Sequence, residues 1–313
     1  MSAQRITAQR RPRPRGWWVP YVIIAPAAIM ELVIHVIPMV TGFVISLLNL
    51  TRYHIRDWSS APFAGLANFI TALNISTPIG QGVLHSFGLS LAYTVCVVTL
   101  AWTFGMVAAT VLQRPFRGRA LWRTLFLVPY ALPMYAGVIT WNFMLQRDSG
   151  LVNHVLVDQL GLMGDRPFWL IGDNAFLSLV IVAVWRNWPF AFLMLMAGLQ
   201  SIPADVYEAA AIDGASSWQQ WRRITLPMLA PVNRVLLLVM SLWVFNDFNT
   251  PFVLFGDGQP ASGDLISFHI YNASFLTWDF GLGSAMSVTL LLVLLAASLI
   301  YMRATSPKEN RHA

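Results

Sequence analysis

Residues 83–112 read VLHSFGLSLAYTVCVVTLAWTFGMVAATVL, an uninterrupted run without Asp, Glu, Lys or Arg. About 20 such residues in an α-helix cross the roughly 30 Å of hydrocarbon in a bilayer. Lipid offers no hydrogen-bonding partners to the backbone, so a helix that satisfies its own peptide groups is the structure expected here. The run therefore predicts a helical membrane protein.

Similar apolar runs recur along the chain, at about 18–49, 121–145, 175–199, 229–255 and 281–303. Of the 313 residues, 57% are hydrophobic and only 11% are charged, which is outside the usual composition of soluble domains. We expect an all-α membrane protein of about six transmembrane helices. Its single membrane domain spans 17–304, between a basic tail, 1–16, and a second tail, 305–313. Four prolines inside the first and third runs predict kinks, namely Pro26, Pro38, Pro129 and Pro133.

Basic residues alternate between the two sides of these runs. One side holds Arg5, Arg10, Arg11, Arg13, Arg15, Arg114, Arg117, Arg119, Arg123, Arg222, Arg223, Arg303, Lys308 and Arg311. The other side holds only Arg52, Arg56, Arg147 and Arg166. Because cytoplasmic loops carry the excess of Lys and Arg, we expect both termini in the cytoplasm. The first run follows the basic tail without a small-residue cleavage site, so it is expected to remain as a span.

The segment 201–227, between the fourth and fifth runs, is more than a connector. It contains EAAAIDGA at 208–215 and ends at Pro227. Gly214 is free to take positive φ and can therefore join two short helices. Tryptophans three apart, Trp218 and Trp221, offer apolar anchors on one face. Small residues leave a second surface almost without side chains, namely Ala209, Ala210 and Ala215. These features favour insertion into a groove of another protein.

This segment resembles the EAA loop in the membrane subunits of bacterial ABC importers, whose pattern is EAAxxDGA followed further on by IxLP. The matching residues are Glu208, Ala209, Ala210, Asp213, Gly214, Ala215, Ile224, Leu226 and Pro227. The sequences at 63–69, 128–133 and 197–203 resemble the carbohydrate branch of that family, and specifically its first, maltose-permease-like subunit. One departure is GDGQP at 256–260, where relatives usually carry Thr-x-Gly-Gly-Pro.

The resemblance implies the ABC type I importer permease fold with a cytoplasmic EAA coupling helix, in a bacterial cytoplasmic membrane. It implies a second permease subunit, an ABC ATPase dimer and an extracytoplasmic solute-binding protein as partners, besides membrane lipids. ATP and Mg would bind the partner ATPase, which Glu208 and Asp213 would face, and this chain would hold no cofactor. The implied solute is a sugar, either an oligosaccharide or a related polyol, moved by alternating access.

No motif for catalysis occurs in the sequence. The only lysine, Lys308, is followed by Glu309, so the chain lacks a P-loop. The six histidines are scattered, the single Cys96 lies inside an apolar run, and neither H-E-x-x-H nor G-x-S-x-G occurs. We expect no catalytic residue, no metal site and no enzyme activity in this chain. Because the basic residues lie between apolar runs, we also expect no nucleic-acid partner.

Polar and aromatic residues within the runs are candidates for the solute pathway. An ionisable group at depth costs about 2.5–3.5 kcal/mol on insertion scales and therefore usually faces the bundle interior. Aromatic rings cover the C–H face of a pyranose and amides bind its hydroxyls. The candidates are Trp141, Asn142, Trp185, Arg186, Asn187, Trp188, Trp243, Asn246, Asp247 and Asn249. A purely structural pairing of Asp247 with Arg186 explains two of them equally well.

Two other functions fit parts of the sequence. The same machinery can carry a solute of the glycerol-3-phosphate type, which would need unpaired cations in the pathway, and away from the edges of the runs only Arg186 and Arg234 are available. An ion-coupled secondary transporter could instead use Glu31, His35 and Asp247. Glu31 and His35 are four residues apart and share a helix face, although a pair buried against a neighbouring helix explains them as well. A membrane enzyme has no supporting motif.

Overall fold

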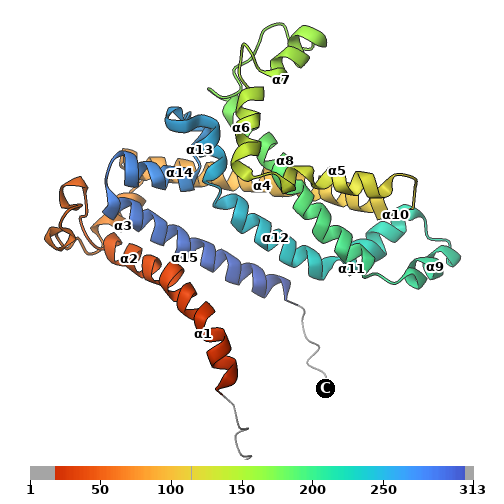
Figure 1. Ribbon diagram of the computed structural model, residues 1–313, viewed down its shortest axis with the longest axis horizontal. Helices are drawn as coiled ribbons and strands as arrows, with labels where there is room; N and C mark the ends of the chain where they lie inside the picture. Colours follow the sequence, from red (N-terminus) through yellow and green to blue (C-terminus); the bar gives the residue numbers. More distant parts are fainter. Residues whose placement is uncertain (1–17, 114, 307–313) are drawn as a thin grey trace, which may run out of the picture.

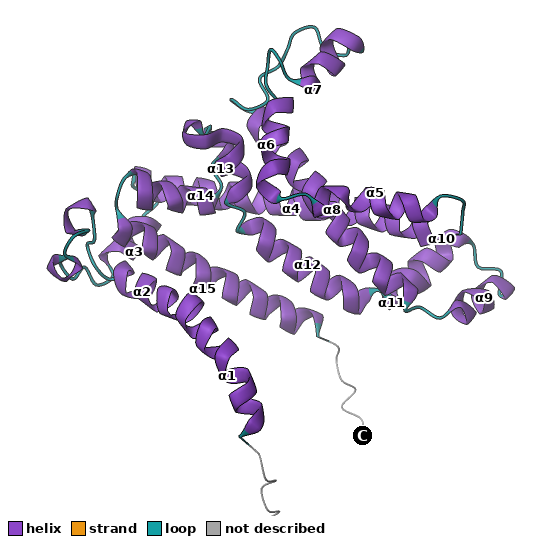
Figure 2. Ribbon diagram, in the orientation of Figure 1, coloured by secondary structure: helices purple, strands orange, loops and turns teal. Residues whose placement is uncertain are grey.

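A computed structural model describes residues 18–113 and 115–306, and these residues form helices joined by loops (Figures 1 and 2). Within them, extended backbone pairs only at two isolated bridges, Leu48 with Phe63 and Thr51 with Asp279. The all-α prediction is therefore confirmed. The predicted tail 1–16, Arg114 and residues 307–313 lie outside the described residues.

Within the described residues, five helices are long and apolar enough to cross a membrane, and a bent pair of helices can make a sixth crossing. The first consists of α1 (Val19–Glu31), a π turn (Leu32–Val36) and α2 (Ile37–Ser46), and it continues through Pro26 and Pro38. The others are α4 (Pro78–Gln113), α8 (Asn174–Gln200), α12 with α13 (Ala230–Phe245 and Asn249–Phe255) and α15 (Phe280–Thr305). About six spans were expected, near these positions.

The bent pair is made of α5 (Arg119–Ala131) and α6 (Met134–Met144), which meet at 90°. Leu132 between them has an extended backbone, with φ −71° and ψ 141°. A residue before proline is disfavoured in the α region, and Pro133 follows Leu132. The predicted kink in the third run is therefore a break of the helix.

The centre of the protein is the contact between α4 and α8, which lie close together (Figure 1). A Cβ on Gly105 would lie 2.7 Å from the backbone nitrogen of Phe192 and 2.8 Å from Cβ of Ala191. Only glycine permits this approach of the two backbones. On the other side, α15 packs against α2 and the short α3 (Ala67–Leu73), and α1 and its π turn contain no buried residue.

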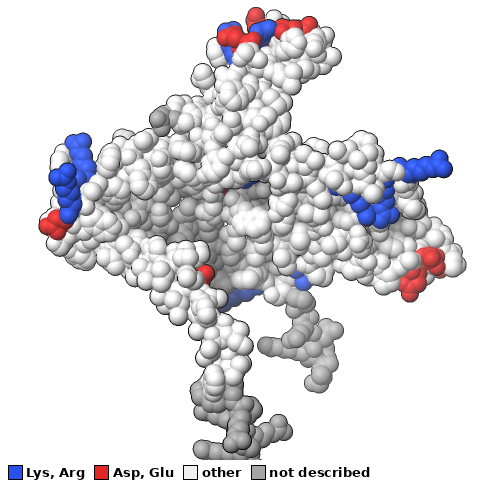
Figure 3. Space-filling view, viewed as in Figure 1, with Lys and Arg blue, Asp and Glu red and all other residues white. Residues whose placement is uncertain are grey.

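The charged residues lie at the ends of the molecule, and the surface between them is almost free of charge (Figure 3). One end, called here the coupling end, carries α9 (Ala204–Ile212), α10 (Ser217–Gln220) and α11 (Leu226–Met228). Another charged region surrounds α7 (Leu151–Asn153), which projects beyond α6 at the top of the view (Figure 1). This distribution is that of a protein whose middle lies in hydrocarbon.

Candidate functional site

The predicted glycine turn lies at the tip of the coupling end. Helix α9 stops at Ile212, and Gly214 takes φ +79°. The backbone nitrogen of Gly214 donates to the oxygen of Ala211 at 3.1 Å, and that of Ala215 donates to Ala210 at 2.9 Å. These two bonds form a Schellman motif, which closes a helix through a left-handed residue. The sequence prediction that two helices meet at Gly214 is confirmed.

Both sides of this turn are fixed by local hydrogen bonds. Ser216 and Gln219 form a capping box that starts α10, with the Ser216 nitrogen donating to Oε1 of Gln219 at 2.8 Å. The hydroxyls of Tyr207 on α9 and Thr225 on the following π turn (Trp221–Thr225) lie 2.9 Å apart. The segment 208–219, called here the coupling turn, is therefore a preformed element held to the helices on either side of it.

The turn presents both charged and apolar groups to the outside. Glu208 and Asp213 are exposed, and within the described residues neither forms an ion pair. Ile212, at the last position of α9, is 87% exposed. Ile212 was not among the predicted residues, although an isoleucine directly before an Asp-Gly helix end was a usable signal. An apolar side chain so exposed is suited to a pocket on a partner.

The two tryptophans were expected to act as paired anchors, and the structure gives them different roles. Their rings stack with centroids 4.9 Å apart. Trp218 is 63% exposed, whereas Trp221 is half-buried and packs against the main core. The ring of Trp218 therefore faces outward, and Trp221 supports it from the core side; the anchor role of Trp218 stays a prediction.

Asp247 is buried among four donors. Its Oδ2 accepts from the hydroxyls of Tyr93 at 2.9 Å and Thr250 at 2.6 Å, and its Oδ1 accepts from the backbone nitrogen of Thr250 at 3.1 Å. Nη2 of Arg186 lies 3.5 Å from Oδ2, while Nη1 of Arg186 is buried without a partner. This cluster joins α4, α8 and the junction of α12 and α13, which is the geometry that a structural pairing of Asp247 with Arg186 would have.

Three predicted pathway tryptophans lie elsewhere. Trp141, Trp185 and Trp188 line an apolar groove between α4, α5, α6 and α8, together with Leu, Ile, Val, Ala and Phe side chains. The rings of Trp141 and Trp185 pack edge to face at 5.9 Å. The structure therefore separates these rings from the amides that were expected to accompany them.

Three predicted asparagines donate to the backbone, and one of them is Asn246, whose Nδ2 donates to the carbonyl of Leu242 at 2.9 Å. Asn142 donates to the carbonyl of Leu254 at 2.7 Å, which ties α6 to α13. Asn187 donates to the carbonyl of Ala183 at 2.8 Å within α8. All three side-chain nitrogens already have acceptors in this conformation.

The remaining candidates form an open surface of rings and amides. Trp243 is 54% exposed and packs against Phe190 at 5.1 Å, and Phe190 stacks on Tyr130 at 6.0 Å. Near them, Asn246 is exposed, and the Tyr135 hydroxyl donates to Oδ1 of Asn249 at 2.9 Å. We call Tyr130, Tyr135, Phe190, Trp243, Asn246 and Asn249 the ring–amide surface. Sequence reasoning missed Tyr130, Tyr135 and Phe190, although two of them flank the predicted kink.

Glu31 and His35 lie on the open side of the first span. Nδ1 of His35 is 3.2 Å from Oε2 of Glu31, and the two side chains are 68% and 66% exposed, respectively. Within the described chain, no neighbouring helix buries this pair. The pair is also not among the residues that surround Asp247.

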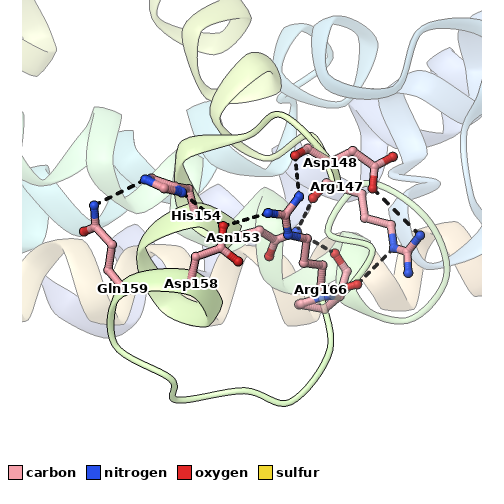
Figure 4. A network of polar contacts seen from close by, with 8 residues as sticks. Arg147, Asp148, Asn153, His154, Asp158, Gln159 and Arg166 are labelled. Atoms are coloured by element: carbon pink, nitrogen blue, oxygen red, sulfur yellow. Dashed lines mark hydrogen bonds and ion pairs between the residues drawn. The ribbon is translucent and has the colours of Figure 1, made fainter.

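The segment around α7 is held by a network of charged and amide groups (Figure 4). Nη2 of Arg166 lies 2.6 Å from Oδ2 of Asp158, and Nδ1 of His154 lies 3.0 Å from the same oxygen. The hydrogen bonds from His154 and then Arg166 lower the pKa of Asp158 below its ordinary value. Beneath them, the buried Asn153 accepts from Nε1 of Trp169 at 2.7 Å. The network gives this loop, which projects beyond α6, a defined shape.

Comparison with known proteins places the chain in a family. Residues 101–308 match the family described as "Binding-protein-dependent transport system inner membrane component". The chain belongs to this family and is a permease subunit of a transport system, in agreement with its multi-pass fold. The family predicted from the sequence is confirmed, and the secondary-transporter alternative is set aside.

Individual relatives cover almost the whole chain. The trehalose/maltose transport system permease protein MalF of Thermococcus litoralis is 32% identical, over 90% of this chain and 92% of its own. The sn-glycerol-3-phosphate transport system permease protein UgpA of Agrobacterium fabrum is 30% identical, over 91% and 94%. A bacterial ABC transporter involved in the import of the acidic polysaccharide alginate shares the fold, with a TM-score of 0.77, 20% identity and coverage of 92% and 95%.

Proposed function

We propose that this permease subunit moves a sugar, an oligosaccharide or a related polyol, through an ABC importer. The ring–amide surface is the observation that carries the proposal. It combines ring faces that suit the C–H face of a pyranose, such as Trp243, with amides at Asn246 and Asn249 for its hydroxyls. The name of the relative from Thermococcus litoralis, a trehalose/maltose permease, supports the same solute class.

The coupling turn is proposed to dock on an ABC ATPase dimer, which would bind ATP and Mg in place of this chain. Ile212 and Trp218 would enter an apolar cleft, and Glu208 and Asp213 would contact its polar rim. The coupling end and both termini would then lie in the cytoplasm of a bacterial cell, beneath its cytoplasmic membrane. A second permease subunit would complete the pathway, and a solute-binding protein would dock at the α7 end.

Co-purification tests the coupling turn. The tagged chain is purified from its own membrane as wild type and as the double variant Glu208→Ala with Gly214→Pro, because proline cannot adopt the φ of +79° found at Gly214. Asp205→Ala is the control, since Asp205 is an exposed acid one turn earlier on α9. An ATPase should accompany wild type and Asp205→Ala and be lost from the double variant. Purification of the chain alone in every case contradicts the proposal.

Uptake into proteoliposomes holding the complete importer tests the solute. Trp243→Ala should lower sugar uptake about fivefold or more, because stacking of a flat ligand on an aromatic ring contributes about 1–3 kcal/mol where it has been measured, for nucleic-acid bases, and Trp243→Phe should keep part of it. Trp58→Ala removes an equally exposed ring in the loop after the first span and should have no effect. Unchanged uptake in Trp243→Ala refutes a pathway role for this surface.

A glycerol-3-phosphate-type solute is the second candidate, because the relative from Agrobacterium fabrum is named for it. An anionic solute needs a free cation in the pathway. Arg186 is instead next to Asp247, 3.5 Å away, which favours a neutral solute. Competition by unlabelled maltose against unlabelled glycerol-3-phosphate in the same uptake assay separates the two candidates.

A further inference from the structure

The apolar groove between α4, α5, α6 and α8 has a volume of about 710 Å³. Every residue that lines it is Leu, Ile, Val, Ala, Phe or Trp, and all of them belong to membrane-spanning helices. On α4, the lining residues Phe104, Val107 and Val111 are each more than half exposed. The groove is therefore open at hydrocarbon depth, where a lipid chain is the most abundant apolar group.

Arginines lie where this groove reaches the coupling end. Nη2 of Arg123 donates to the carbonyl of Leu112 at 3.1 Å, and Leu112 itself lines the groove. Phe126, one turn after Arg123 on α5, also lines it. One turn before, Nη1 of Arg119 donates to the carbonyl of Gln113 at 3.3 Å. Figure 3 shows the basic atoms at the end of the molecule where α5 begins.

These arginines keep charge and donors to spare. In the described residues neither Arg119 nor Arg123 forms an ion pair with a carboxylate, and Nε of Arg123 is buried without a partner. A guanidinium presents its donors in a fixed fork that matches phosphate oxygens. The orientation of the chain in the membrane requires arginines on this side of the bilayer, but it does not require them at the entrance of an apolar groove.

We propose that the groove holds an acyl chain of an anionic phospholipid whose phosphate binds Arg119 and Arg123. The acyl chain fills the groove from Leu112 towards Leu177, and the headgroup stays at the level of the α5 start. Basic pockets between transmembrane helices bind anionic headgroups in this manner. The site lies on other residues than the ring–amide surface and does not depend on the nature of the solute.

Photolabelling in nanodiscs tests the headgroup half of this proposal. The chain, with any subunits that purify with it, is reconstituted with phosphatidylglycerol that carries a diazirine in one acyl chain, and labelled peptides are identified by mass spectrometry. The matched probe is phosphatidylcholine with the same acyl chains. Phosphatidylglycerol should label residues 100–112 and 177–188, and Arg119→Gln and Arg123→Gln should each lower that labelling about fivefold. Arg303→Gln, an exposed arginine at the end of α15, is the control.

A groove-filling variant tests the acyl-chain half without touching the arginines. Val107→Trp places a large ring in the groove from an exposed position, so the fold should tolerate it, and labelling at 177–188 should disappear. Leu295→Trp makes the same kind of change at an exposed position of α15 outside the groove and should leave labelling intact. Equal labelling by both lipids, equal labelling of α1 and α15, or occupation of the groove by a co-purifying subunit each overturns the proposal.

Discussion

Replacement of Asp247 by alanine should strongly destabilise the protein, because the side chain serves four donors at once. The substitution removes the acceptor of the Tyr93 and Thr250 hydroxyls and leaves the Arg186 guanidinium buried with no carboxylate beside it. Loss of one partner of a buried ion pair costs about 3–5 kcal/mol. Arg186→Met should cost less, about 1–3 kcal/mol, because Asp247 keeps its three bonds from Tyr93 and Thr250.

Thermal unfolding in detergent, followed by the fluorescence of the 13 tryptophans, measures how strongly each variant is destabilised. The midpoint should fall most in Asp247→Ala and less in Arg186→Met. The double variant should be more stable than Asp247→Ala alone, because the unpaired cation has gone. If Asp247→Ala unfolds at the wild-type temperature, or if Arg186→Met fails to rescue it, the buried ion pair does not contribute as we argue.

Three further outcomes are expected. Gly105→Ala should lower the free energy of unfolding by about 1–3 kcal/mol through overpacking, because its Cβ would lie 2.8 Å from that of Ala191. Gly88→Ala on the same helix is the control, because its Cβ would meet nothing within 4 Å. The unfolding midpoints of the two variants are compared. Asp158 has a pKa lowered below 3.8, so it stabilises the α7 segment above that pH and the effect is lost on acidification. Protection factors of the amides in residues 147–166, which remove the intrinsic pH dependence of hydrogen exchange, should fall towards pH 3 in wild type but change little with pH in Asp158→Asn. Gly214→Asn should keep the ATPase in co-purification better than Gly214→Val, because asparagine tolerates positive φ and a β-branched residue does not.

The sequence was sufficient for the spans, because the cost of exposing polar groups to lipid acts on each run separately. The run 83–112 corresponds to Pro78–Gln113, and the run 281–303 to Phe280–Thr305. The turn at Gly214 was equally local: a helix that ends in a left-handed residue needs glycine wherever the rest of the chain lies. The 90° break at Leu132 was expected only as a kink, because the size of a bend depends on what the next helix packs against.

The pathway residues could not be sorted from sequence, because helices in lipid are apolar on every side and periodicity does not reveal their inward face. Trp185 and Arg186 are neighbours on α8, yet Trp185 faces the groove while Arg186 reaches Asp247. Phe190, one turn after Arg186, belongs to the ring–amide surface. Such an assignment requires the packing of α4 and α12 on either side of α8.

The order of the helices along the chain explains how a movement of the coupling turn could reach the ring–amide surface. Helix α8 ends at Gln200, and α9 begins at Ala204 after only three residues. On the other side of Gly214, helical segments follow one another closely from Ser217 to the end of α12. The turn thus connects α8, which bears Arg186 and Phe190, to α12, which bears Trp243. The hydrogen bond between Tyr207 and Thr225 ties the two sides of the turn together. Because Asp247, just beyond the end of α12, contacts Arg186 midway along α8, we expect a partner that moves the turn to displace α8 and α12 together and so to change the ring–amide surface as a unit.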